Sequence, residues 1–444
     1  ALANASSTDA LTLTLTDTAL ASADDLIALD GKTSVAVNAT SVTSVTDTYA
    51  DINTLYGLSG ISGLGNEAVT ISDETSAVNI NGILSKTSGV VTATVTSDTA
   101  ASLNSALTNT TGNDALTLTV TGTAAATDLT ALDGKTSVNV GATAVTTITG
   151  TQAQVVAINV GTITTSGNYA VTLSDTSLSA AAIKTVNTQN GTGAIDISSV
   201  TTITSSTAAD VLEIVNNTNS TFTTAANYAV TISDTVSATV ANTIVNDTTG
   251  IVTATVTEAT AASLNSALAN ASSTDALTLT LTDTVLASGS DLIALNNKTS
   301  VDVNAGTVTS ITDTYANINA IYSGTGISGL GNEAVTISDT TSAANVNGIL
   351  SKTSGVVTAT VSSDTASNLN TALTNATSSD ALTLSVTGTA AATDLNSLDG
   401  KTSVNVIVNA TSVTGNFSDL NTLYVTNQAN FSSLGDDAVT ISDT

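Results

Sequence analysis

The feature that most constrains this chain is a long internal repeat. Residues 1–140 return as residues 267–406 at a constant offset of 266, and 112 of the 140 aligned positions are identical. A fixed period of this kind is typical of repeat architectures, in which each unit contacts only its neighbours. We therefore expect residues 1–444 to form one continuous array. Residues 1–266 are its first long repeat, and residues 267–444 are a partial second one.

The two ends of the sequence also follow the repeat. The chain has no initiator Met, its first residues enter the pattern partway through, and a new unit opens at residues 439–444. This predicts that the sequence is a fragment of a longer array.

Composition narrows the class of protein. Seven Lys face 36 acidic residues, which gives a net charge of −29. Such a charge argues against partners that are nucleic acids or anionic membranes. The mean hydropathy of +0.31 is too high for a disordered chain. No apolar run approaches the length of a membrane span. Cys, His, Met, Trp and Pro are all absent. The lack of oxidisable sulfur suits life outside the cell and equally fits a cytosolic chain.

Two local patterns alternate within each long repeat. The first is a short strand in which aliphatic residues alternate with Thr or Ser, as at residues 11–16, 69–72 and 91–96. The second is a segment with helical spacing, such as residues 98–107, where Ala100, Leu103 and Leu107 share one face. Two further triplets have the same spacing: Tyr49, Ile52 and Tyr56; Ala77, Ile80 and Leu84.

Polar residues and glycines mark the expected ends of the helices. Asp, Ser or Thr at the strand-to-helix junctions can cap the first helical turn. We expect glycines after the helices to adopt the left-handed conformation. Six lysines in Lys-Thr-Ser sequences should face the negative ends of helix dipoles. The residues concerned are Asp47-Thr48, Ser72-Asp73 and Asp98-Thr99 at the starts, Gly31, Gly134 and Gly400 at the ends, and Lys32, Lys86, Lys135, Lys298, Lys352 and Lys401.

These patterns predict a solenoid. The expected strand starts are spaced about 21–25 or 33–34 residues apart, and the longer units have room for a second strand at residues 40–46. Strand, helix and parallel strand in succession predict a parallel sheet on one side with short helical segments on the other. The leucine-rich repeat is nearest in unit length, although its consensus is missing. A pure parallel β-helix is the alternative.

Five aspartates recur in one Ser-Asp setting at strand ends. They can cap helices or form Asx turns, and they can also bind calcium, because stacked coils would bring carboxylates close together. The sequence has neither an EF-hand loop nor the glycine-rich repeat of calcium β-rolls. The candidate calcium ligands are Asp73, Asp175, Asp234, Asp339 and Asp443.

No residue pattern indicates catalysis. Carboxylates are spread by the repeat, whereas an active site is normally a single exception to such a pattern. The unduplicated residues 141–266 are where an exception would lie, and Gln152, Gln154, Lys184 and Glu213 form no recognisable constellation there. We therefore expect no enzyme and no required cofactor, with calcium as the one candidate ligand.

Outward Thr rows and four recurring tyrosines complete the pattern. Thr suits the solvent face of a strand, and ordered Thr rows also resemble those of ice-binding proteins. We expect the tyrosines to be half-buried packing residues. The residues are Thr12, Thr14, Thr16, Thr92, Thr94, Thr96, Thr117, Thr119, Thr278, Thr280 and Thr282, with Tyr49, Tyr56, Tyr315 and Tyr322.

The chain as a whole resembles the very large repetitive surface and secreted proteins of bacteria, particularly those of cyanobacteria. The resemblance rests on the Thr/Ala/Asp/Asn/Val bias, the units that read VTISDT, the absence of Cys and the near-identical long repeats. It implies a location outside the bacterial cell or on its surface. We expect a structural protein that forms a fibre, sheath or surface array with copies of itself. The alternative is a rigid adhesin stalk that binds glycan, mineral or ice.

Overall fold

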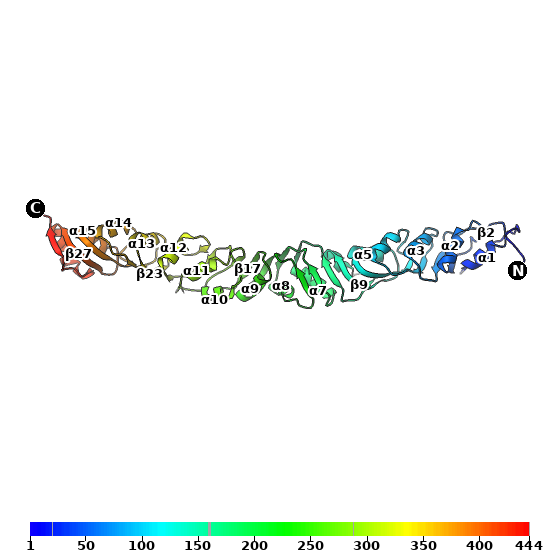
Figure 1. Ribbon diagram of the computed structural model, residues 1–444, viewed down its shortest axis with the longest axis horizontal. Coiled ribbons are helices and arrows are strands. Elements are labelled where there is room, and N and C mark those ends of the chain that lie inside the picture. Colours follow the sequence, from blue (N-terminus) through cyan, green and yellow to red (C-terminus); the bar gives the residue numbers. More distant parts are fainter. Residues whose placement is uncertain (20, 159–160, 287, 444) are drawn as a thin grey trace. The chain divides into compact units, whose positions relative to one another are not determined.

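The computed structural model describes residues 1–19, 21–158, 161–286 and 288–443. They fall into two compact units, Ala1–Tyr228 and Ala229–Thr444. Within each unit short parallel strands alternate with short helices (Figure 1). The boundary between the units does not coincide with residue 267, where the long sequence repeat restarts.

In the first unit, one sheet has the strand order β1-β3-β5-β6-β7 and another has the order β10-β9-β11-β13-β15, with β8 beside β9. Two smaller pairings join β2 to β4 and β12 to β14. The strands are β1 (Ala21–Ser22), β2 (Val37–Asn38), β3 (Ser44–Asp47), β4 (Ile61–Ser62), β5 (Ala68–Ile71), β6 (Val91–Thr94), β7 (Ala115–Thr117), β8 (Thr119–Ala125), β9 (Val140–Gly150), β10 (Ile163–Thr165), β11 (Ala170–Leu173), β12 (Ser177–Ser179), β13 (Ile195–Ile197), β14 (Thr202–Ser206) and β15 (Phe222–Thr224).

Short helices connect these strands. They are α1 (Ala23–Asp30), α2 (Tyr49–Gly57), α3 (Ala77–Leu84), α4 (Ala100–Ala106), α5 (Ala126–Asp133), α6 (Gln152–Ala157), α7 (Ala180–Gln189) and α8 (Ala208–Val215).

The second unit has the same organisation. Its pairings run β16-β17-β18, β19-β21-β23-β24-β25, β20-β22 and β26-β27-β28, with β29 also beside β27. Its strands are β16 (Ala229–Val236), β17 (Val252–Val256), β18 (Ala276–Thr278), β19 (Val285–Leu286), β20 (Val303–Asn304), β21 (Ser310–Asp313), β22 (Ile327–Ser328), β23 (Ala334–Thr341), β24 (Val357–Val361), β25 (Ala381–Thr383), β26 (Ser385–Ala391), β27 (Val406–Gly415), β28 (Phe431–Ser432) and β29 (Ala438–Ile441). Its helices are α9 (Ala238–Asp247), α10 (Ala261–Ala267), α11 (Ser290–Asn296), α12 (Tyr315–Ser323), α13 (Ala343–Leu350), α14 (Ala366–Ala372), α15 (Ala392–Asp399) and α16 (Phe417–Asn421).

The register of the strands gives the length of one coil. The shortest step in the described pairings is 20 residues, as from Thr235 to Thr255, and the longest is 27, from Ile195 to Phe222. The 33–34-residue spacing expected for the long units is therefore wrong. The second strand expected near residues 40–46 exists as β3. A coil is also completed within the long unit, because Val37 pairs with Ile61 after 24 residues.

The core follows from the two periodicities. In β6 Val91 and Ala93 are buried while Thr92 and Thr94 are exposed, because successive side chains point to opposite faces of a strand. The buried residues of α4 are Ala100 and Leu103. Full burial of one Val or Leu side chain stabilises the fold by about 1.5–3 kcal/mol. Each coil therefore holds together by an apolar strand face packed on an apolar helix stripe.

The alternation of parallel strands and helices confirms the repeat solenoid-like fold. The pure β-helix alternative required strands or turns where residues 98–107 contain α4. One expected strand is missing, because residues 11–16 make only an isolated bridge, from Thr14 to Asn38. The repeat counterpart of this segment contains β18, which pairs with the upstream β17. The first coil has no upstream strand in this chain.

The expected left-handed glycines are also wrong. Gly31 has φ −64 and ψ −6, and its N–H continues the helical hydrogen bonding to the Ile27 carbonyl. Gly134 and Gly400 are right-handed as well. In the second long repeat Asn297 takes the place of Gly31 with the same conformation. These helices end by running on into a right-handed turn, so no residue with positive φ is needed there.

Candidate functional site

The predicted calcium ligands lie where successive coils meet. The Tyr49 N–H at the start of α2 donates to Asp73 Oδ1 at 2.7 Å, although Asp73 belongs to the following coil. The same contact joins Gln152 to Asp175 at 2.7 Å and Tyr315 to Asp339 at 2.6 Å. Phe417 at the start of α16 donates in the same way to Asp443. A negative side chain at the positive end of a helix stabilises it.

The capping interpretation of these aspartates therefore holds in a modified form. Asp73 does not cap the helix that follows it, because Ser76 is the residue that accepts from the first turn of α3. Thr48 and Thr99 cap their own helices, as predicted. Asp234 and Asp339 are exposed and lie inside β16 and β23, so the expected position at a strand end is wrong for these two. None of the five predicted ligands belongs to a group of three close carboxylates within the described residues.

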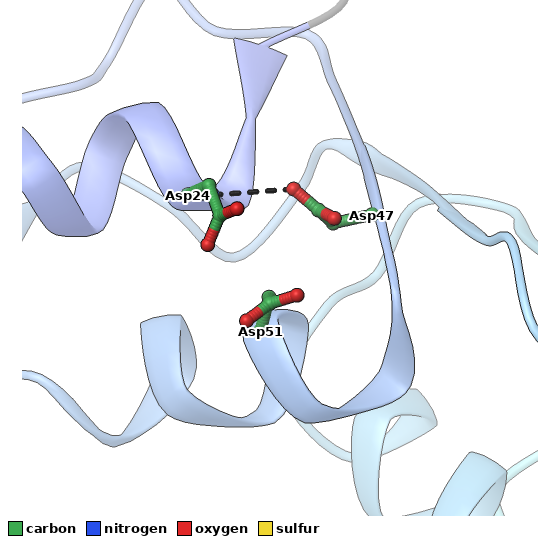
Figure 2. Close-up of side chains that lie close together, drawn as sticks. All are labelled: Asp24, Asp47 and Asp51. Carbon is green, nitrogen blue, oxygen red and sulfur yellow. Dashed lines mark hydrogen bonds between the residues drawn. The ribbon is translucent and has the colours of Figure 1, made fainter.

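One group of three carboxylates does occur, and the sequence reasoning missed it. One carboxylate oxygen each of Asp24, Asp47 and Asp51 lie within 4.8 Å of one another (Figure 2). Asp24 stands in the first turn of α1, Asp47 ends β3 and Asp51 lies in the first turn of α2. We call these three residues the acidic triad. The 24-residue coil brings them together from two coils, so no local motif identifies them.

Hydrogen bonds and charge shape the acidic triad. Asp47 accepts hydrogen bonds from the Ser22 hydroxyl at 2.8 Å and from the Asp24 N–H at 3.2 Å. The Ser22 bond is the largest cause of a lowered pKa at Asp47. The negative charge of Asp51 raises the pKa of Asp24, and burial and the charge of Asp47 raise it further. The triad therefore contains one well-satisfied carboxylate and one that is destabilised by its neighbours.

The second long repeat contains a version of this site with a single carboxylate. Ser290 replaces Asp24, Asn317 replaces Asp51 and only Asp313 remains acidic. Asp313 accepts from the Ser290 N–H and from the Asn317 side chain, each at 2.9 Å. Burial acts to raise the pKa of Asp313, but the hydrogen bonds from Thr314, Asn317 and Ser290 outweigh it and the pKa is lowered. The two copies are thus a matched pair.

Three buried aspartates were also missed. Asp114 is only 2% exposed and accepts from the Val91 N–H of the preceding coil at 2.9 Å and from the Thr111 N–H at 2.7 Å. Asp275 and Asp380 make the equivalent contacts. A sequence pattern could have identified them, because each aspartate follows Thr or Ser by three residues and precedes Ala-Leu-Thr. Their partners are backbone amides, which is the setting of a structural carboxylate.

Two buried glutamates each accept hydrogen bonds from a tyrosine hydroxyl and from backbone N–H groups of a neighbouring loop. Glu67 accepts from the Tyr56 hydroxyl and from the Gly65 N–H at 2.6 Å, and Glu333 repeats this with Tyr322 and Gly331. Burial first and the glutamate second raise the pKa of both tyrosines. In the last coil Tyr424 faces Asp437, and burial and this carboxylate raise its pKa to about 12. The expected half-buried packing role of Tyr56 and Tyr322 is confirmed.

The Lys-Thr-Ser turns also act on the coil before them. Lys298 Nζ donates to the Leu268 carbonyl at 2.8 Å, and Lys401 Nζ donates to the Leu373 carbonyl at 2.7 Å. Leu268 and Leu373 are the C-caps of α10 and α14, one coil upstream. Lys135 makes the equivalent contact to Leu107 at the end of α4. Three of the six lysines therefore neutralise helix C-termini, as predicted, but on the neighbouring coil.

The unduplicated residues 141–266 place their polar side chains in structural contacts. Gln154 completes a capping box with Thr151, and the Gln152 backbone takes part in the Asp175 contact. Lys184 forms ion pairs with Asp210 and Glu213, each at 3.1 Å. The hydrogen bond to Asp210 is the largest cause of a raised pKa at Lys184. A protonated lysine of this kind is a poor nucleophile.

The sequence matches no protein-family model and no curated protein. One solved structure, "Plant peptide hormone receptor RGFR1 in complex with RGF2", aligns over 97% of this chain and 74% of that chain. The sequence identity is 10% and the TM-score is 0.18. In the part of the chain that the structure describes, no helix is both long enough and apolar enough to cross a bilayer.

Proposed function

We propose that this chain is a structural repeat protein located outside a bacterial cell or on its surface. It serves as a module of a fibre, sheath or surface array, associates with copies of itself and carries out no catalysis. The observation that carries the proposal is the bonding between coils. Asp73, Asp175 and Asp339 each accept a hydrogen bond from the first N–H of a helix in the coil before it. Such coils present similar faces repeatedly, and repeated faces favour open-ended association.

The finer fold assignment is part of this proposal. Coils of 20–27 residues, read from the steps Thr235 to Thr255 and Ile195 to Phe222, fall within the 20–29 residues of a leucine-rich repeat. We infer a β/α solenoid with leucine-rich-repeat-like unit length. The high negative charge keeps such modules soluble until they assemble.

A rigid adhesin stalk is the second candidate, and the exposed Thr rows favour it. Thr70 lies beside Thr92, and Thr94 lies beside Thr117, so hydroxyl groups line up across neighbouring coils. Adjacent parallel strands are about 4.8 Å apart, and such rows can meet a regular surface of glycan, mineral or ice. Ala115 interrupts the row after Thr92, which limits its length.

Calcium is the ligand that we propose for the acidic residues. The five Ser-Asp aspartates, Asp73, Asp175, Asp234, Asp339 and Asp443, remain the predicted ligands. The acidic triad adds a second candidate, because a divalent cation would relieve the repulsion that raises the pKa of Asp24. Its remaining ligands would be waters or backbone carbonyls.

Electron microscopy of the purified chain tests the main proposal. The sample is imaged with calcium and with chelator, at equal ionic strength. Filaments or sheets of uniform width support the structural role, and their loss in chelator would place calcium within the assembly. Isolated particles that stay monomeric in both conditions contradict self-association and favour the adhesin stalk. Binding to ice, insoluble glycan and mineral particles would then be measured.

A further inference from the structure

We infer that each coil completes helix ends of the coil before it. The inference rests on which coil supplies the side chains that form hydrogen bonds with the ends of each helix. An α-helix leaves its first N–H groups and last carbonyls without partners inside the helix. In this chain, side chains of the following coil supply many of these partners.

The N-terminal contacts have this direction in seven helices. In each of them the first N–H donates to a side chain of the following coil. The acceptors from the following coil are Asp73 for α2, Asp175 for α6, Ser206 for α7, Asp283 for α10, Asp313 for α11, Asp339 for α12 and Asp443 for α16. Asp47 does the same for the second residue of α1.

The C-terminal contacts have the same direction. Lys135, Lys298 and Lys401 each reach back by 28 or 30 residues to the carbonyl that ends a helix of the preceding coil. One coil thus supplies an anion to the positive end and a cation to the negative end of helices upstream of it, and both contacts are electrostatically favourable.

The consequence is that several helix ends depend on groups from the coil after them. Contacts in the opposite sense also exist. Asn104 donates to the Asp128 carbonyl in the first turn of α5, and Asn296 donates to the Thr325 carbonyl just after the C-cap of α12. These contacts neither accept from the first N–H of a helix nor reach its C-cap carbonyl. The helix ends named above therefore gain all their side-chain partners only when the coil after them is in place. Loss of one cap should loosen the helix upstream, whereas the helix next in sequence should keep its protection.

Hydrogen exchange of the full chain tests this inference. The variant is Asp73→Ala, because Asp73 is close in sequence to α3 but caps α2, one coil upstream. Loss of a helix cap of ordinary strength should speed exchange in the first turn of α2 about fivefold. Peptides that cover residues 76–84 should exchange at the rate of the unmodified protein.

Two further variants serve as matched controls. Ser76→Ala removes the local cap of α3, so it should speed exchange in α3 and leave α2 unchanged. Asp339→Ala repeats the main experiment in the second unit, where α12 should respond and α13 should not. Faster exchange in α3 after Asp73→Ala, or equal changes on both sides, would overturn the inference. Asp73→Asn keeps an acceptor, and it should restore slow exchange if the cap is the cause.

Discussion

At the scale of single residues, the position within the coil decides what a carboxylate does. Asp73 is exposed and caps a helix of the neighbouring coil. Asp114 is buried and holds backbone amides of two segments. Asp24 lies against two other carboxylates and has few compensating partners. The same side chain is therefore stabilising in the first two settings and destabilising in the third.

The Tyr322 hydroxyl should stabilise the second unit through the buried Glu333. Tyr322→Phe removes one of the donors to Glu333, which is 0% exposed and accepts two backbone N–H groups besides the hydroxyl. Loss of a hydrogen bond to a charged group should lower the free energy of unfolding by about 1.5–3 kcal/mol. Chemical denaturation followed by circular dichroism measures this change.

Tyr424→Phe is the control for that substitution. Asp437 is half-buried, and the Tyr424 hydroxyl lies 3.4 Å from it, so water can replace the lost donor. We expect a loss below about 1 kcal/mol. Equal effects of the two substitutions would show that burial of the carboxylate does not determine the strength of the contact.

Asp24 of the acidic triad should respond to pH in the opposite sense to Asp313. Asp24 has a raised pKa, so its folded state gains protons more readily than its unfolded state, and acidification removes a destabilising charge. Asp313 has a lowered pKa, so its contribution is complete above the ordinary value of 3.8 and is lost as the pH falls through the lower folded value.

The substitutions Asp24→Ser and Asp51→Asn, taken from the second long repeat, test this difference. At neutral pH the double variant should slow hydrogen exchange in α1, because the repulsion is gone. Its advantage over the unmodified protein should shrink as the pH approaches the ordinary carboxyl range and Asp24 takes up its proton. An advantage that stays constant from neutral pH to pH 4 would show that Asp24 is not the titrating group.

At the scale of helices and strands, local sequence patterns predicted which segments form helices and strands. They did not predict which residues of neighbouring coils contact each other. The spacing of Ala100 and Leu103 correctly placed α4, and alternation correctly placed β6. Register was not predictable from local patterns, because pairing after 22 or 27 residues depends on loop lengths that periodicity does not encode. The acidic triad and the inter-coil caps depend on that register. They could not be found before the coil length was known.

Two glycines should respond to the same substitution in opposite ways. Gly31 is right-handed, and an added Cβ would be 3.5 Å from the nearest atom, the Ala28 carbonyl oxygen. Gly31→Ala should therefore raise the free energy of unfolding by about 0.4–1 kcal/mol. At Gly89 an added Cβ would be 2.2 Å from the Glu67 carbonyl oxygen, so Gly89→Ala must displace the backbone of the neighbouring coil.

Thermal melting of the two variants measures the contrast. We expect a small rise in melting temperature for Gly31→Ala and a clear fall for Gly89→Ala. A fall in melting temperature for both variants would contradict the expectation that alanine fits the right-handed backbone conformation of Gly31.

At the scale of the whole molecule, the two long repeats separate the effect of calcium from that of general ionic strength. The first repeat has the acidic triad, and the second has Ser290, Asp313 and Asn317 in the same places. A ligand that binds only the folded state stabilises it by about 2.7 kcal/mol at a hundred times its dissociation constant. If calcium binds the triad, it should raise the melting temperature, and the Asp24→Ser, Asp51→Asn variant should lose that response.

The same experiment distinguishes the triad from the five Ser-Asp aspartates. Calorimetric melting is recorded in calcium, in chelator and in chelator with matched ionic strength, for the unmodified chain and the double variant. A calcium response that survives in the variant assigns binding to carboxylates such as Asp73 and Asp339, which the substitutions leave intact. The absence of any calcium response in the unmodified chain would remove the ion from the proposal. Cohesion of the array would then rest on the backbone ladders, the packed core and the caps that each coil provides to the coil before it.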